Sequence, residues 1–420
     1  MHAILEYVAI GVMLIIFLTV SFVVTYEVMQ PASGVYHERI YTVAERLMDK
    51  IVLTTGIPVD WGTNIGVGPS NLTDFGLALN GTRNPYEIDP DKVMRLANLT
   101  SLPNPLLMNT TRLAQLLGIE RQYGFRLKIK PMLNILITPI EWYNVRNRYV
   151  YPSVLEVSVS NYFNIGIPNV NVTGMYVIVK VSPGVGNQGQ IELKTIFVQS
   201  NVTDVQGNCI LNYYSQLRDY FEQNNINKWY FAFLIVHVNW YGFVSVAGYS
   251  CTSQGDAPVQ GYIIGNYIFV SRDVNVTNIG RGGGNAGAVL VEDELLQAVP
   301  EYSELLNFTT VTWCRDSNGQ FRNDDPLCNA AGRVLPSATQ WYLIGHIEYI
   351  EKLSSHVFVF AQYRGNPIAI VINRIPSIDI VYGSKQATPA NSVTIRRIVH
   401  LYNYPYIVEL TVWRIAEGWP

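Results

Sequence analysis

The 420-residue chain has little charge. Asp, Glu, Lys and Arg make up only 15% of it, and the net charge is −3. Proteins that bind nucleic acid carry clustered Lys and Arg that neutralise phosphates, so this composition excludes a strong electrostatic attraction to nucleic acid. Aromatic residues, by contrast, make up 12%, with 27 tyrosines. Little charge with abundant Tyr, Val, Ile, Thr and Asn is typical of β-structure, and we expect attached sugars rather than Lys and Glu to keep its surface soluble.

The chain also lacks the motifs of the common catalytic and cofactor sites. Its six histidines are scattered, none of them in an H-E-x-x-H pattern, and no G-x-S-x-G nucleophile elbow occurs. The glycine run at residues 280–284 has no following Lys-Ser/Thr, so it predicts a flexible loop rather than a phosphate-binding loop. Asp324 and Asp325 supply fewer carboxylates than a Ca²⁺ site needs. The sequence therefore predicts no enzyme, no cofactor and no metal site.

Cysteine is scarce: the chain contains only Cys209, Cys251, Cys314 and Cys328. No C-x-x-C pair or other metal-ligand spacing occurs, which argues against a structural zinc site. We expect two disulfides in an oxidising compartment, and among the three possible pairings we favour Cys314–Cys328 with Cys209–Cys251. Closing the Cys314–Cys328 loop would contribute about 3 kcal/mol by the chain-entropy model. The alternative is four buried free thiols.

The twenty consecutive residues from Tyr7 to Tyr26 carry no charge and are strongly apolar. As a helix it would be roughly 30 Å long, the thickness of the hydrocarbon core of a bilayer. The two tyrosines would then lie at the level of the lipid headgroups, where amphipathic rings are enriched. A cleaved signal peptide would have a basic start and a short apolar core, but residues 1–6 contain no Lys or Arg. We predict a retained helix that anchors the chain in a membrane.

A second helix is predicted directly after the anchor. Pro31, Ser33 and Gly34 interrupt the first helix, because proline removes an intrahelical hydrogen bond. From about residue 35 to 54, apolar side chains recur at helical spacing with charged ones between them. The apolar positions are Tyr36, Ile40, Val43, Leu47 and Ile51. The pattern predicts one long, kinked helix, half of it in the membrane and half packed on a globular head.

Eight N-x-S/T sequons follow the anchor, more than chance gives at this length and composition. They are centred on Asn71, Asn80, Asn98, Asn109, Asn171, Asn201, Asn275 and Asn307. Glycosylated sequons belong to the outer surface of proteins that face the cell exterior. We therefore expect the chain beyond the anchor to lie on the extracellular face of the cell envelope.

The whole sequence predicts a mainly β protein, α+β overall. We divide it into four consecutive segments. These are the anchor and amphipathic helix over 1–54, a helix-and-strand head over 55–150, an immunoglobulin-like β-sandwich over 151–258 and a second antiparallel β domain over 259–420. In the head, Asp89 can cap a helix that starts at Pro90, and Asn109 can cap a second helix that ends at Gly118. A glycan on Asn109 would compete with that cap.

From about Pro152 the pattern changes to that of strands. Leu155, Val157 and Val159 alternate with polar residues, which is typical of a half-buried strand. Together with the turns that follow, as far as Asp204-x-x-Gly207, this segment resembles an immunoglobulin-like or carboxypeptidase-regulatory-like β-sandwich. An apolar strand over 229–238 is expected to fill its core.

An ordered set of short motifs covers about the first 130 residues. The run TTGIPVDW at 54–61 follows the amphipathic helix, and FGLA at 75–78, IDPDKV at 88–93 and LLGI at 116–119 come after it. This set resembles a family of archaeal membrane-anchored surface proteins with a type IV pilin-like N-terminal helix. Pilin-type precursors carry a basic leader and then Glu at the fifth mature position. Glu6 takes that position only if Met1 is lost, and no basic leader precedes it in the sequence. We therefore expect one of three explanations: an upstream start, a shifted numbering or a plain signal anchor.

The resemblance and the anchor imply two functions. In the first, the protein is a pilin-like structural subunit of an extracellular filament, with glycosylated β-domains facing outward. Its partners are then copies of itself, and the small residues Ala9 and Gly11 allow the apolar helices to pack closely. In the second, the protein is a monomeric adhesin tethered in lipid, which recognises a surface glycan or protein through its outer β-domains. The first is the preferred hypothesis.

Overall fold

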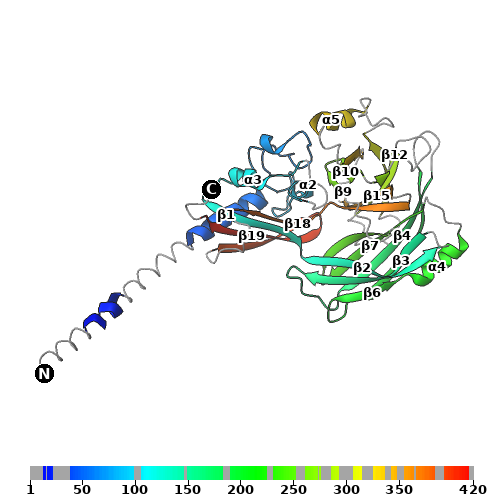
Figure 1. Ribbon diagram of the computed structural model, residues 1–420, viewed down its shortest axis with the longest axis horizontal. Helices are drawn as coiled ribbons and strands as arrows, with labels where there is room; N and C mark the ends of the chain where they lie inside the picture. Colours follow the sequence, from blue (N-terminus) through cyan, green and yellow to red (C-terminus); the bar gives the residue numbers. More distant parts are fainter. Residues whose placement is uncertain are drawn as a thin grey trace, which may run out of the picture.

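The computed structural model describes most of the chain beyond residue 37. The described residues are 13–15, 17–21, 38–98, 106–145, 149–182, 190–224, 230–251, 261–272, 274–275, 285–292, 306–314, 325–335, 342–347, 354–363, 366–383 and 392–415. As predicted, they form a mainly β protein, and their strands make four sheets, which we call the head, outer, central and large sheets (Figure 1).

The head contains the predicted amphipathic helix, described over residues 38–53. Its buried side chains include Ile40, Ala44, Leu47 and Ile51, which recur at intervals of three or four and therefore share one face. This face packs into the main core of the protein. The prediction of an amphipathic helix is confirmed over these residues.

Both predicted helix caps are present. The Asp89 side chain accepts hydrogen bonds from the first N–H groups of α2 (Pro90–Met94). The Asn109 side chain accepts from the N–H of Thr111 at the start of α3 (Thr110–Leu116). Gly118 then takes φ 71°, the left-handed conformation in which glycine commonly ends a helix. A single 3-10 turn, η1 (Pro69–Asn71), precedes them.

The head sheet joins segments from the two halves of the chain. β1 (Tyr123–Pro131) lies between β17 (Ile378–Tyr382) and β19 (Tyr404–Arg414), and β18 (Ser392–Leu401) pairs with the other edge of β19. In this register Phe125 lies opposite Val412 and Tyr382. Since β1 falls in the segment predicted as 55–150 and its partners fall in 259–420, the strand pairing crosses the predicted boundaries.

The outer and central sheets face each other as a sandwich. The outer sheet has the order β2 (Leu133–Val145), β3 (Tyr149–Asn161), β6 (Asn208–Asn212), and the central sheet has the order β5 (Gln190–Val202), β4 (Asn171–Ser182), β7 (Tyr230–Trp240), β8 (Phe243–Ser250). The predicted alternation in β3 is confirmed, because Leu155, Val157 and Val159 are buried in the core between these sheets. α4 (Tyr214–Gln223) adds Leu217 and Phe221 to the same core.

The large sheet covers the opposite face of the central sheet. Its order is β11 (Val274–Asn275), β15 (Ser354–Tyr363), β12 (Asn285–Glu292), β13 (Leu306–Trp313), β14 (Tyr342–His346), β10 (Tyr267–Ser271), β9 (Gly261–Ile264), and β16 (Asn366–Asn373) also pairs with β15. Phe233 of β7 stacks on Phe358 of β15, whereas Leu234 of β7 faces the core of the sandwich. The central sheet is therefore the middle of three layers, which explains why its strand β7 is a continuous apolar run.

The predicted long apolar helix over residues 7–26 is not present in the described structure. No helix among the described residues is long and apolar enough to cross a membrane. Helical backbone is described only at 13–15 and 17–21 of this segment, and Glu6, Tyr7, Ala9, Gly11 and Tyr26 lie outside the described residues. An apolar helix gains most of its stability from packing, and the described side chains of this segment are exposed, with no neighbour among the other described residues.

Candidate functional sites

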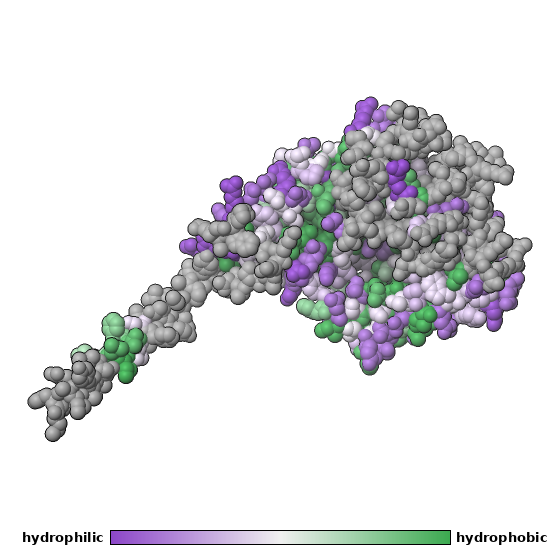
Figure 2. Space-filling view, viewed as in Figure 1, coloured by the Kyte–Doolittle hydropathy of each residue, from purple (hydrophilic) through white to green (hydrophobic). Residues whose placement is uncertain are grey.

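The helical residues between 13 and 21 form an apolar surface that no other described part of the chain covers. Their exposed apolar side chains are Met13, Leu14, Ile15, Phe17, Leu18 and Val20, with exposed fractions from 55% to 76%. At 100° per residue these positions are distributed all around the helix axis. Figures 1 and 2 show this segment lying apart from the globular body, with apolar side chains on its surface. Such a surface indicates contact with lipid or with another protein.

The helix over residues 38–53 is attached firmly to the head. Besides its buried face, the Lys50 ammonium lies 2.8 Å from the carboxylate of Asp74 and donates to the carbonyl of Leu116 at 3.0 Å. Thr54, just beyond the helix, donates to the carbonyl of Phe75. Apolar packing and polar contacts therefore both fix the helix over residues 38–53 on the head.

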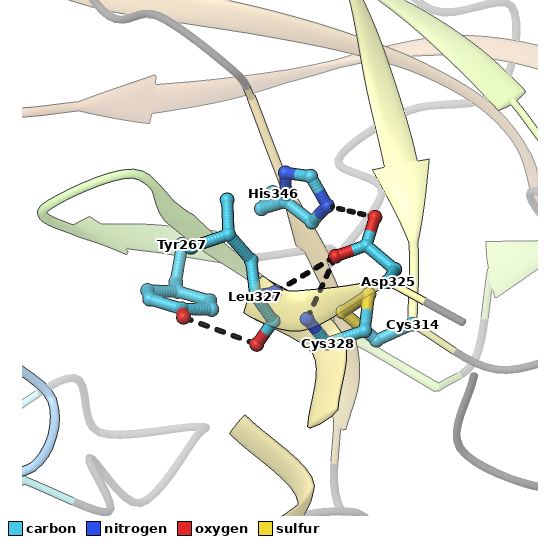
Figure 3. Close-up of a disulfide and its surroundings, with 6 residues drawn as sticks. All are labelled: Tyr267, Cys314, Asp325, Leu327, Cys328 and His346. Carbon is cyan, nitrogen blue, oxygen red and sulfur yellow. Dashed lines mark hydrogen bonds and ion pairs between the residues drawn. A yellow bond between two sulfur atoms is a disulfide. The ribbon is translucent and has the colours of Figure 1, made fainter. Parts of the chain in front are cut away.

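A disulfide joins β13 to α5 (Pro326–Val334), as predicted from the sequence. Cys314 directly follows β13, Cys328 lies in the first turn of α5, and their Cα atoms are 4.8 Å apart. Figure 3 shows the polar contacts around this bond. Tyr267 donates a hydrogen bond from its hydroxyl to the carbonyl of Leu327 at 3.1 Å.

Asp325 organises the same region. One of its carboxylate oxygens accepts hydrogen bonds from the backbone N–H of Leu327 and of Cys328, at 2.9 and 3.0 Å, and so caps α5. Its other oxygen lies 2.8 Å from Nε2 of His346 (Figure 3). Burial opposes its ionisation, but the hydrogen bonds from Cys328 and His346 outweigh burial and hold the pKa of Asp325 below its ordinary value.

Asp325, Cys328 and His346 present potential metal-ligand atoms within 4.8 Å of one another. The donor set does not suit a metal, because the sulfur of Cys328 is bonded to Cys314 and provides no thiolate. Both oxygens of Asp325 already accept hydrogen bonds within the protein. The cluster is best explained by two structural roles of Asp325: it caps α5, and it links α5 to β14 through its hydrogen bond with His346.

The predicted second disulfide was wrong. Cys209 and Cys251 are free and buried. Cys209 is on β6 of the outer sheet, whereas Cys251 follows β8 of the central sheet, and Tyr213 lies near both thiols. The even number of cysteines suggested a pair, but the two residues belong to opposite layers of one core. Burial raises the pKa of Cys209 to about 11 and also raises that of Cys251, so both behave as apolar core residues.

Most of the sequon asparagines lie at the surface. Asn71, Asn80, Asn98, Asn109, Asn171 and Asn201 are exposed. Asn307 on β13 is half-buried, and the side chain of Asn275 lies outside the described residues. At Asn109 the cap uses the oxygen Oδ1, at 2.8 Å from the N–H of Thr111, whereas a glycan attaches to the nitrogen Nδ2. The cap and a glycan are therefore compatible at this position.

One buried charge cluster was not anticipated from the sequence. The carboxylate of Asp91, in α2, accepts a hydrogen bond from the N–H of Gly265 and lies 3.8 Å from Arg374, so it bridges the head and the large sheet. Burial raises the pKa of Asp91 to about 6. The ammonium of Lys92 donates to the carbonyls of Thr55 and Ala78. Besides starting α2, the IDPDKV motif therefore supplies charged side chains that link α2 to the large sheet and to other parts of the head.

Comparisons of the chain with protein-family models, with curated proteins and with solved structures give no match. The function is therefore argued from the geometry of the protein and from its sequence.

Proposed function

We propose that the protein is a cell-surface structural protein, a pilin-like subunit of an extracellular filament. The observation that supports this most is the exposed segment at residues 13–21, whose described apolar side chains lie on all sides of the helix axis. In the sequence it precedes the helix over residues 38–53, which has one face buried in the head. In a filament the apolar segments of many subunits cover one another, with close packing at small residues such as Ala9 and Gly11. The three-layer β body, with its exposed sequons, then faces outward.

A second candidate is a monomeric, membrane-tethered adhesin. It is favoured by the tip of the β7–β8 hairpin, where Tyr241 is 88% exposed. The rings of Trp240 and Tyr241 are 5.7 Å apart, and those of Trp240 and Phe243 are 6.2 Å apart. Exposed aromatic rings of this kind pack on sugars and on protein side chains at low entropic cost.

The test compares two variants that carry the same chemical change at different places. Ile15→Asp puts a charge on the apolar segment, and Val205→Asp puts one on a loop of the sandwich where the side chain is 78% exposed. We expect Val205→Asp to leave fibres visible by electron microscopy, with the subunit identified by mass, and Ile15→Asp to abolish them. A parent protein that is found only as a detergent-soluble monomer, with no fibres on cells, would contradict the filament.

The adhesin is tested separately with Tyr241→Ala. Loss of binding to cells or glycans in this variant, with the parent remaining monomeric in detergent, would favour the second candidate. N-terminal sequencing of the same material shows whether Met1 is retained.

A further inference from the structure

A basic cavity lies at the end of the head where the helix over residues 38–53 begins. It has a volume of about 350 Å³ and is lined by Arg39, Arg121 and Arg414. Arg39 lies in the first described turn of that helix, Arg121 just before β1, and Arg414 at the end of β19. Figure 1 shows β1 starting and β19 ending on the side of the head that faces the N-terminal segment. Three elements that are distant in sequence thus place three arginines around one cavity.

Two of these charges have no partner in the described part of the protein. There, neither Arg39 nor Arg121 forms an ion pair or a side-chain hydrogen bond. The nearest acidic residues in sequence are Glu38 and Glu120, and Glu120 accepts a hydrogen bond from Gln115 instead. Like charges around one cavity repel each other, so an anion bound among them lowers the electrostatic energy of the site.

The backbone holds the arginines in place before any ligand arrives. Arg121 has φ 70°, the left-handed conformation, within a turn closed by hydrogen bonds from the N–H groups of Gln122 and Tyr123 to the carbonyl of Ile119. The N–H of Ile415, next to Arg414, donates to the carbonyl of Gln122 at 3.0 Å. This bond ties the end of β19 to the same turn. The cavity is therefore largely pre-formed, which lowers the entropic cost of binding.

The chemistry of the lining suits a phosphate group. A guanidinium presents a planar fork of N–H donors that matches the oxygens of phosphate, and several forks supply more donors than one carboxylate can accept. Gln122 and Tyr123 also line the cavity, and both are neutral residues. No acidic residue is among the described residues that line it.

We propose that this cavity binds the phosphate of an anionic lipid headgroup. The proposal rests on the proposed function, which places the apolar segment at residues 13–21 in the membrane or at its surface before assembly. Arg39 and Ile40, which line the cavity, belong to the helix that follows this segment in the sequence, so the same proposal places the cavity near the headgroups. Free phosphate offers the same chemistry, and the test below separates the two sources.

The experiment uses the full chain solubilised in a non-ionic detergent and measures binding by thermophoresis. The probes are inorganic phosphate, micelles that contain a small fraction of phosphatidylglycerol, and matched micelles that contain zwitterionic phosphatidylcholine. The variants are Arg39→Gln, Arg121→Asn and their combination, since Asn tolerates the left-handed backbone at position 121. Arg46→Gln is the matched control, because Arg46 is exposed on the same helix and does not line the cavity.

We expect the parent and Arg46→Gln to bind phosphatidylglycerol micelles equally, and the double variant to bind at least about tenfold more weakly. Thermal unfolding checks that each variant is folded. Tighter binding of phosphatidylglycerol than of inorganic phosphate supports a lipid site, whereas equal binding of both assigns the cavity to free phosphate and overturns the lipid. Unchanged affinity in the double variant overturns the site altogether.

A further outcome would assign the cavity to a second copy of the chain. If neither probe binds but the double variant no longer self-associates, a carboxylate of a neighbouring subunit fills the cavity, and the phosphate proposal fails. Because binding is measured on solubilised chains, the presence or absence of filaments does not decide it. Conversely, failure of phosphate binding leaves the comparison of Ile15→Asp with Val205→Asp intact as a test of assembly.

Discussion

Phe233 of β7 stacks on Phe358 of β15, with ring centroids 4.1 Å apart and ring planes 25° from parallel. Beside this pair, Phe231 of β7 meets Phe360 of β15 at 5.0 Å. All four rings are at most 1% exposed. These rings pack the central sheet against the large sheet. They bury one face of β7, whose other face lies in the core between the outer and central sheets.

The first prediction concerns this contact. Phe358→Ala should lower the free energy of unfolding by about 3–5 kcal/mol, because it removes a buried ring and leaves a cavity between two layers. Tyr241→Ala, which removes a ring that is 88% exposed, should change it by less than about 0.5 kcal/mol. Denaturant unfolding of both variants is the measurement. Equal stability of the two would mean that the layers are not packed through these rings.

The second prediction concerns the cysteines. After denaturation without reductant, the chain should show two reactive thiols, Cys209 and Cys251, and after reduction it should show four. In the folded protein both free thiols should react slowly, because burial removes access and raises their pKa. Mass spectrometry after alkylation counts them. A denatured, unreduced chain with no reactive thiol would reveal the second disulfide that the structure lacks.

Reduction of the Cys314–Cys328 disulfide should also lower the stability of the protein measurably. Opening Cys314–Cys328 should lower the free energy of unfolding by about 3 kcal/mol in the chain-entropy model, since it frees a short loop in the unfolded chain. Cys209→Ala provides the control, because it should leave the effect of reductant unchanged.

Local features of the fold could be predicted from the sequence. The amphipathic stripe at residues 38–53, the caps at Asp89 and Asn109, and the short-range Cys314–Cys328 bond each depend on neighbours within a few turns or one loop. For such features the chemistry of the interaction and the positions of the residues are visible together in the sequence.

Long-range arrangements could not be predicted. β1 pairs with β17 and β19, which lie more than 240 residues further along, and nothing in a strand pattern specifies such a partner. For the same reason nothing beyond the even number of cysteines in the sequence favours pairing Cys209, on β6 of the outer sheet, with Cys251, which follows β8 of the central sheet. The arginine-lined cavity is assembled from three elements that are remote in sequence, so its residues carry no local pattern.

The third prediction separates the cap at Asn109 from a glycan there. Asn109→Ala and Asn109→Asp both destroy the sequon, so each should lose the mass of one glycan if the site is occupied. Only the alanine variant also loses the acceptor for the N–H of Thr111, which should cost about 1 kcal/mol. Thermal unfolding of the deglycosylated variants measures the difference. Equal stability of the two would show that this cap contributes nothing.

The fourth prediction concerns two buried groups whose pKa values are shifted by burial in opposite directions. Burial raises the pKa of Asp91 from 3.8 to about 6, and burial lowers the pKa of His356 from 6.5 to about 4. Between pH 4 and 6 the folded protein therefore holds a proton on Asp91 and none on His356, whereas the unfolded chain holds one on the histidine and none on the aspartate. The two states bind the same number of protons at this pair, so its net contribution to the pH dependence of stability is close to zero.

Removing either group should reveal the pH dependence that the other group gives to the free energy of unfolding. Relative to the parent, Asp91→Asn should lose stability as the pH falls from 6.5 to 4, because only the unfolded chain then binds a proton at His356. His356→Gln should instead lose stability as the pH rises from 4 to 6, because the unfolded chain ionises at Asp91 more readily than the folded protein does. Each difference should approach about 1.4 kcal/mol per pH unit. Denaturant unfolding at pH 4, 5, 6 and 7 measures it, and parallel curves for both variants and the parent would contradict the burial of these two charges.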